Sequence, residues 1–183
     1  MLQKRLLNSC NWYNDATVLQ DTISMAYFPI SQHPKAWAFQ HENVPIAEDD
    51  LKKIKPMEAQ RATTFWNTFV SKQVDHPDFF KKGDWPFNPN TWCEQGKWEV
   101  QWDSDHEALP ELILEHLSWP SNTVVYYCND RKQVIETTWD VFQRTWKNFL
   151  FMDDGPLLIG KKRDQVVQFM SNGTFRIGNK SAI

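Results

Sequence analysis

Apolar side chains recur with a helical period in three segments of the chain. The clearest segment is 57–73, whose apolar positions follow the spacing i, i+3, i+4, i+7 and i+8, which predicts a helix with one core-facing side. These positions are Ala62, Phe65, Trp66, Phe69 and Val70. The segment 109–117 carries a similar pattern. A third helix is predicted to begin at Trp139 after Thr138 as its N-cap, and its buried stripe consists of Phe142, Trp146, Phe149 and Leu150.

Charged residues and helix-stopping residues refine these boundaries. The segment 47–54 begins with acidic and ends with basic side chains, an order that favours a short helix because it complements the helix dipole. Pro56 ends this short helix. Gly155 stops the helix that begins at Trp139, and Pro156 prevents its continuation.

Runs rich in β-branched and aromatic residues dominate the chain after residue 122. TVVYYC (123–128) and QVIETT (133–138) flank a polar four-residue turn, which predicts a β-hairpin. Asn172-Gly173 predicts a second hairpin, because this dipeptide favours the tight turns that join antiparallel strands. The three strands predicted in this region are 157–162, 166–171 and 174–179.

Two short aromatic runs earlier in the chain also have strand character. AWAFQH (36–41) predicts a strand, and so does 98–102, where Trp98, Val100 and Trp102 alternate with polar residues. We therefore expect one compact α+β domain with a mostly antiparallel sheet of about five to six strands and three to four helices.

Residues 1–24 differ from the rest of the chain, because they show no sustained periodicity of either kind. Met25 opens MAYFPISQHPKAWAFQH, which is typical of the beginning of a domain. We interpret 1–24 as an N-terminal extension or a misplaced start, and 25–183 as the single domain. The alternative is an N-terminal helix that docks on the domain through Leu6, Leu7 and Trp12.

Composition and charge narrow the classes of function. The 183 residues carry 20 basic and 23 acidic side chains, for a net charge of -3, so nucleic acid and anionic membranes are not expected partners. No apolar run is long enough to cross a bilayer. The three cysteines are an odd number without a C-x-x-C pair, which favours the cytoplasm. The sequence contains no GxGxxG or Walker-type loop, and we expect no cofactor.

The chain is rich in tryptophan, and its most unusual segment is the long loop predicted at 75–97. Within 78–92, aromatic residues alternate with charged ones, a mixture that is typical of a surface that binds a protein partner or of a stacking platform for a sugar or base. The aromatic residues are Phe79, Phe80, Trp85, Phe87 and Trp92. The alternative interpretation is that the loop wraps the sheet and buries these rings in the core.

Two groups of acidic residues are candidates for chemistry. Asp103, Asp105, His106 and Glu107 place oxygen and nitrogen ligands within five residues, a set that a divalent ion can use. Capping of the following helix by Asp103, Ser104 or Asp105 explains the same cluster without a metal. Asp153 and Asp154 are the candidate acid–base carboxylates, although Asp-Asp-Gly-Pro is also ordinary turn sequence.

Four stretches resemble a bacterial, mainly gammaproteobacterial, family of uncharacterised proteins that share a domain of unknown function. They are MAYFPI…KAWAFQH, IKPM…QRA…W, HPDFFKKGDWP and TTWDVFQRTWKNFLFMDDGPLLI. The resemblance covers roughly Met25 to the C-terminus, implies a compact cytoplasmic domain and transfers no catalytic residue. The C-terminal pattern of W-x-x-F-L, D-D-G and hairpins is also similar to SMI1/KNR4-type domains, many of which act as immunity proteins that neutralise toxins.

The sequence favours a cytoplasmic, non-enzymatic binding or protein-interaction domain whose partner surface centres on 78–92. A second hypothesis is a small metal-dependent or acid/base hydrolase whose site is assembled only in the fold. A third is a structural subunit of a larger assembly. The sequence leaves open which of these applies and whether the protein is an enzyme.

Overall fold

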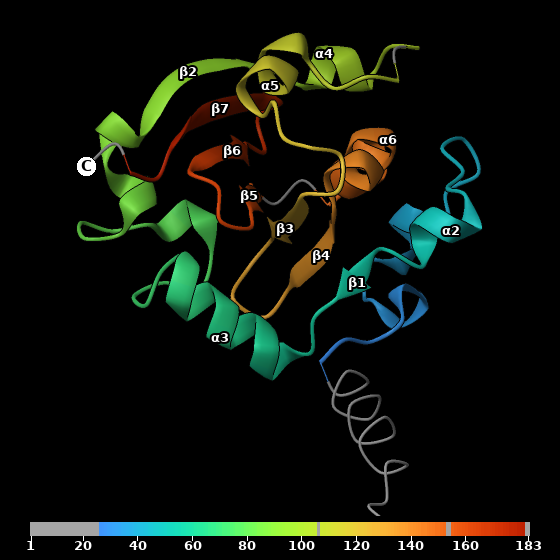
Figure 1. The fold of residues 1–183 in the computed structure, drawn as a ribbon, viewed down its shortest axis with the longest axis horizontal. Helices are drawn as coiled ribbons and strands as arrows, with labels where there is room; N and C mark the ends of the chain where they lie inside the picture. Colours follow the sequence, from blue (N-terminus) through green and yellow to red (C-terminus); the bar gives the residue numbers. More distant parts are fainter. Residues whose placement is uncertain (1–25, 106, 153–154, 182–183) are drawn as a thin grey trace, which may run out of the picture.

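The computed structural model describes residues 26–105, 107–152 and 155–181. These residues form a seven-stranded antiparallel sheet with the order β1-β4-β3-β5-β6-β7-β2 (Figure 1). The strands are β1 (Lys55–Pro56), β2 (Trp92–Lys97), β3 (Val124–Cys128), β4 (Val134–Thr138), β5 (Leu157–Gly160), β6 (Gln165–Phe169) and β7 (Thr174–Asn179). The α+β class is confirmed, and the sheet has more strands than the expected five to six.

Helices cover both faces of this sheet. The α-helices are α2 (Glu48–Leu51), α3 (Ala59–Phe69), α4 (Glu99–Trp102), α5 (Glu111–His116) and α6 (Trp139–Leu150). Figure 1 shows α6 and α5 on one side of the sheet and α3 on the opposite side. Five short 3-10 turns complete the described structure: η1 (Ile30–Gln32), η2 (Ala36–Phe39), η3 (Pro77–Phe79), η4 (Trp85–Phe87) and η5 (Pro89–Thr91).

The alternation of side chains along the strands creates two apolar cores. In β3, Val125 and Tyr127 pack in the core beneath α6, whereas Tyr126 and Cys128 pack in the core beneath α3. Trp146 of α6 and Trp66 of α3 are both fully buried and supply the largest side chains of the two cores. The largest fully buried side chain of each core therefore comes from an amphipathic helix.

The long periodic patterns of the sequence are confirmed. Helix α3 lies within the predicted segment 57–73, α5 lies within 109–117, and α6 begins at Trp139. Strands β3 and β4 form the predicted hairpin, and Gly173 joins β6 to β7 with a φ of +79°, a conformation that glycine adopts without strain. Thr138 is the N-cap residue of α6, as predicted, but its hydroxyl donates to the Asp140 carboxylate and accepts no backbone N–H of the first turn.

Two predicted strands are wrong. The segment 36–41 contains the 3-10 turn η2, and 98–102 contains α4. Trp98 and Trp102 are four positions apart in the chain, a spacing that fits a helical as well as an alternating period. The indole N–H of Trp98 donates to the Met170 carbonyl at 3.1 Å, and that of Trp102 donates to the Lys147 carbonyl at 3.0 Å. These two long-range hydrogen bonds favour the helix.

The segment 75–97 is also more regular than a loop. It consists of η3, η4, η5 and the edge strand β2, which pairs with β7. Two glycines matter for this packing. Gly96 of β2 leaves room for the Phe175 ring, and Gly178 of β7 leaves room for the Thr91 carbonyl. A Cβ atom on Gly178 would lie 1.9 Å from that carbonyl oxygen.

Candidate binding surface

The segment 78–92, which we call the aromatic segment, lies on the same face of the sheet as α3. Figure 1 shows the chain from the end of α3 through η3, η4 and η5 beside this helix. Proline occupies an early position in each of the three turns, where its fixed φ favours the turn and its missing N–H is not needed. The segment is therefore held as a series of tight turns rather than as an irregular loop.

Asp84 fixes the centre of the aromatic segment. Its buried carboxylate accepts hydrogen bonds from the Ser71 hydroxyl at 2.6 Å and from the Lys81 backbone N–H at 3.0 Å. The side-chain amide of Gln73 donates to the same carboxylate at 3.3 Å. Because a buried carboxylate requires such donors, this network anchors the segment to the end of α3.

Trp85 and Trp92 hold the aromatic segment against the core and are only partly exposed. Both rings are half-buried against the core beneath α3, with their centroids 6.2 Å apart. The indole N–H of Trp85 donates to the Phe69 carbonyl and that of Trp92 to the Pro86 carbonyl, each at 2.9 Å. Phe80 is also half-buried and stacks on Trp66 with a centroid distance of 6.3 Å. These rings hold the segment in place.

Phe79 and Phe87 are the exposed rings of the aromatic segment, with 62% and 53% of their surface accessible. Phe69, at the end of α3, is 52% exposed, and its carbonyl accepts the Trp85 indole N–H. The periodicity of 57–73 predicts a buried Phe69, but the residue ends α3 and its ring is half exposed. Both interpretations of the aromatic segment are therefore correct in part: Phe79 and Phe87 are exposed, whereas the other rings pack against the core.

Arg176 of β7 adds a positive charge that sequence analysis did not identify. Its guanidinium carbon lies 3.9 Å from the centroid of the Trp92 ring, a cation–π contact. Its Nε and Nη2 donate to the Gln168 side-chain oxygen at 3.0 and 2.6 Å. Burial lowers the pKa of Arg176 to about 10. Phe175 and Ile177 pack in the core beneath α6, so Arg176 between them points to the other face of the sheet. The alternation along the strand alone predicts that a charged residue at this position faces solvent.

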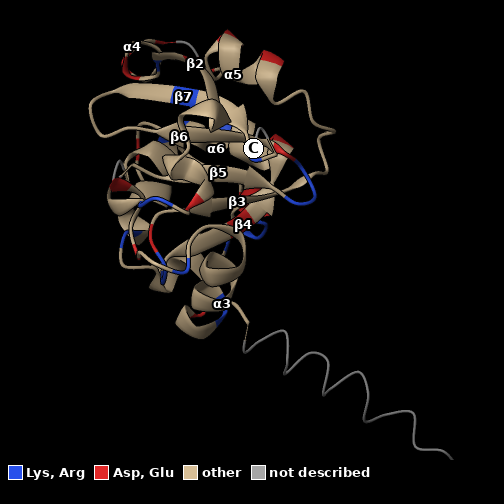
Figure 2. Cartoon of the chain, turned by 90° about the vertical axis from the view of Figure 1, so that its left-hand side faces the viewer, with Lys and Arg blue, Asp and Glu red and all other residues tan. Residues whose placement is uncertain are grey.

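The charges around this surface differ from those at α4 and α5. Figure 2 shows acidic positions on α4 and α5 and a basic position on β7. Lys81 and Lys82 of the aromatic segment are exposed, and so is Lys97 at the end of β2. Exposed basic side chains therefore accompany the exposed rings, together with the exposed Asp78 beside Phe79.

Only part of the candidate metal cluster lies within the residues that the structure describes. Asp103 ends α4 by donating its backbone N–H to the Glu99 carbonyl, and Asp105 and Glu107 are exposed. Helix α5 has Pro110 at its N-cap, so the predicted capping by 103–105 is wrong. The residues that the structure describes contain no group of three or more His, Cys, Asp or Glu that could hold a metal. His106, Asp153 and Asp154 lie outside the described residues, as do residues 1–24.

Comparison with known proteins gives one match. Residues 27–178 match a family model described as a protein of unknown function, DUF2947. No curated protein and no solved structure matches the chain. Among the described residues, no helix has both the length and the apolar character that a membrane span requires.

Proposed function

We propose that this chain, which belongs to the DUF2947 family, is a non-enzymatic protein-interaction domain of the bacterial cytoplasm whose partner binds at the aromatic segment. The supporting observation is the placement of exposed rings. Of the five large hydrophobic side chains that the described residues leave exposed, Phe79 and Phe87 lie on this segment and Phe69 lies against it. The other two are Trp37 and Val100.

The fixed conformation of the aromatic segment favours binding. A segment that is already held by Asp84 and by the two indole hydrogen bonds loses little conformational entropy when a partner binds. Rings such as Phe79 and Phe87 then contribute apolar area that is removed from water on binding. The lysines beside them favour a partner with acidic side chains, because complementary charges increase the association rate.

The alternative hypothesis of a small metal-dependent or acid/base hydrolase has no specific observation in its favour among the described residues. Among those residues, the candidate carboxylates Asp103, Asp105 and Glu107 belong to no group of three or more side chains that could hold a metal ion. The aromatic segment is therefore the stronger basis for a functional proposal.

The test is capture of a partner from native lysate with the full-length chain as bait, followed by mass spectrometry. The variant Phe69→Ser/Phe79→Ser/Phe87→Ser should reduce capture of a stoichiometric partner by about tenfold or more. These positions are preferable to Trp85 and Trp92, whose replacement would also remove hydrogen bonds that hold the segment. Circular dichroism and thermal unfolding should show that the variant remains folded.

Trp37→Ser is the matched control for this experiment. Trp37 is 52% exposed, as Phe69 is, but it packs against Phe151 on the α6 side of the molecule. The control should capture the partner as the wild-type chain does. Unchanged capture by the triple variant would contradict the proposal, and so would an equal loss in the control.

A further inference from the structure

Arg176 lies on the face of the sheet that the aromatic segment covers. Its partners in the sheet are Gln168 of β6 and Gln95 of β2, so its nearest neighbours on both sides are neutral. The Trp92 ring packs on its guanidinium from above the sheet. Gln168 is almost fully buried, whereas Arg176 keeps partial access to solvent. Arg176 is therefore packed against an aromatic ring and neutral neighbours and is still partly accessible to solvent.

The hydrogen bonds of Arg176 use only one edge of its guanidinium. Nε and Nη2 both donate to the Gln168 oxygen, which occupies the edge that these two nitrogens share. The other edge, formed by Nη1 and the second N–H of Nη2, has no acceptor among the described residues. This free edge is the end-on fork that matches the two oxygens of a carboxylate.

Among the described residues, Arg176 also has no counter-charge. Throughout the described ranges, no carboxylate lies within ion-pair distance of it, and burial is the cause of its lowered pKa. Arg144 of α6, in contrast, has a counter-charge, because two of its nitrogens donate to the Asp50 carboxylate at 2.8 and 2.9 Å. A partly buried guanidinium without an acid is costly for the folded protein, and such residues are concentrated at binding sites.

We propose that Arg176 binds a carboxylate of the protein partner through its free edge, with Trp92 as the stacking platform. This inference rests on the proposed function and adds the chemistry of the partner, which must present an Asp or Glu side chain or a C-terminal carboxylate. Lys97 lies on the same face of β2 as Gln95 and is exposed, so it adds a second positive charge next to the site.

The test is a nuclear magnetic resonance titration of the full-length chain with acetate, at constant ionic strength maintained with chloride. The Nε–H signal of Arg176 and the indole N–H signal of Trp92 report directly on the site. Acetate should shift both signals in a saturable manner, with a Kd of about 10–100 mM for one charge-assisted pair. A parallel titration with inorganic phosphate serves as the second arm.

Two variants make the assignment specific. Arg176→Lys keeps the positive charge but loses the planar fork, and it should abolish the saturable shift of the Trp92 signal. Lys180→Gln is the matched control, because Lys180 is also partly buried at the end of β7 but lies beyond Gly178, where the Thr91 carbonyl packs. This control should keep the wild-type response. Loss of the response in the control, or its retention in Arg176→Lys, would overturn the assignment to Arg176.

The outcomes separate this inference from the proposed function, because the titration needs no partner. A captured partner without an acetate response would overturn the role of Arg176 alone. An acetate response without any captured partner would support the site and overturn the interaction proposal. A response to phosphate that exceeds the response to acetate would overturn the carboxylate assignment.

Discussion

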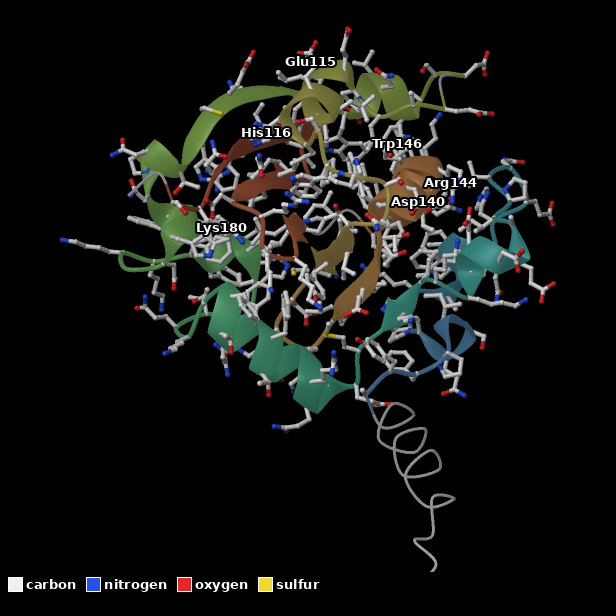
Figure 3. All side chains as sticks on the ribbon, in the orientation of Figure 1. Glu115, His116, Asp140, Arg144, Trp146 and Lys180 are labelled. Carbon is white, nitrogen blue, oxygen red and sulfur yellow. The ribbon has the colours of Figure 1, made fainter. Side chains whose placement is uncertain are left out.

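At the scale of single residues, Asp50 shows how one carboxylate connects two distant elements. It lies in α2 and accepts two hydrogen bonds from Arg144 of α6, and Figure 3 shows Arg144 and Asp140 together on that helix. The hydrogen bond from Arg144 holds the pKa of Asp50 below its ordinary value of 3.8, although burial acts in the opposite direction. The pair therefore stabilises the folded state only while Asp50 is ionised.

Replacing Asp50 by Asn should lower the free energy of unfolding by about 1–3 kcal/mol at pH 7, since hydrogen bonds to a charged group are lost. A carboxylate with a lowered pKa in the folded state contributes its full stability above its unfolded pKa. The difference between wild type and variant should therefore shrink as the pH falls below 3.8 and through the folded pKa. Urea denaturation between pH 7 and pH 3 measures it.

Asp49→Asn is the control for this prediction. Asp49 lies beside Asp50 but is exposed, and its ion pair with Lys52 spans 3.4 Å at the surface. Its replacement should change stability by less than about 1 kcal/mol. A loss at Asp49 as large as that at Asp50 would show that helix α2 responds to any change of charge rather than to the Arg144 pair.

At the scale of elements, the contact between β7 and the aromatic segment depends on Gly178. The Thr91 carbonyl occupies the place of a side chain at this position, immediately before β2 begins at Trp92. Gly178→Ala should therefore destabilise the fold by about 1–3 kcal/mol, because backbone atoms must move to admit the methyl group. Chemical denaturation measures the loss, and the indole N–H signal of Trp92 in a nuclear magnetic resonance spectrum should report a displaced segment.

Asn179→Ala is the matched control in the same strand, because the Asn179 side chain makes no hydrogen bond in the part of the chain that the structure describes. Its effect should stay within about 0.5 kcal/mol, the usual range for surface substitutions. If Gly178→Ala is as stable as this control, the aromatic segment does not depend on close packing at β7.

The success of sequence prediction also differed between elements. Helices α3 and α6 and the hairpins after residue 122 were predictable, because their patterns repeat over several turns or are joined by a diagnostic turn. The runs at 36–41 and 98–102 are too short to separate a helical from an alternating period. Their conformation depends on contacts with distant residues, such as the bond from Trp102 to the Lys147 carbonyl.

The candidate site was predictable only in part, for a similar reason. Sequence analysis selected the aromatic segment from its composition, but composition does not reveal which rings are exposed. That outcome depends on acceptors elsewhere in the chain, as with Trp85 and the Phe69 carbonyl. Arg176 was missed because its environment is created by Trp92 and Gln168, which come from two other strands.

At the scale of the whole molecule, the described residues before α3 join the sheet edge to the core beneath α6. Strand β1 pairs with β4, and Tyr27 forms a bridge with Met57. The Asn148 side chain of α6 donates to the Ala38 and Val44 carbonyls, each at 2.9 Å. This N-terminal part therefore belongs to the same packed unit as the sheet.

His33 gives this N-terminal part a pH-dependent contribution to stability. Its buried ring stacks on Phe28 and meets the edge of Phe39, with centroid distances of 6.1 and 6.5 Å. Burial lowers the pKa of His33 below its ordinary value of 6.5, and the nearby Lys35 acts in the same direction. The folded state therefore favours the neutral ring.

The sign of the resulting pH dependence follows from proton binding. Below pH 6.5 the unfolded chain protonates His33 while the folded chain does not, so stability should decrease as the pH falls from 6.5 toward the folded pKa. His33→Asn retains an acceptor near the position of Nδ1, which accepts the Lys35 N–H, but has no titrating group. Urea denaturation at several pH values between 7.5 and 5 should show a flatter profile for this variant. An unchanged slope would mean that other groups cause the acid sensitivity of the fold, and that the N-terminal part does not depend on a neutral His33.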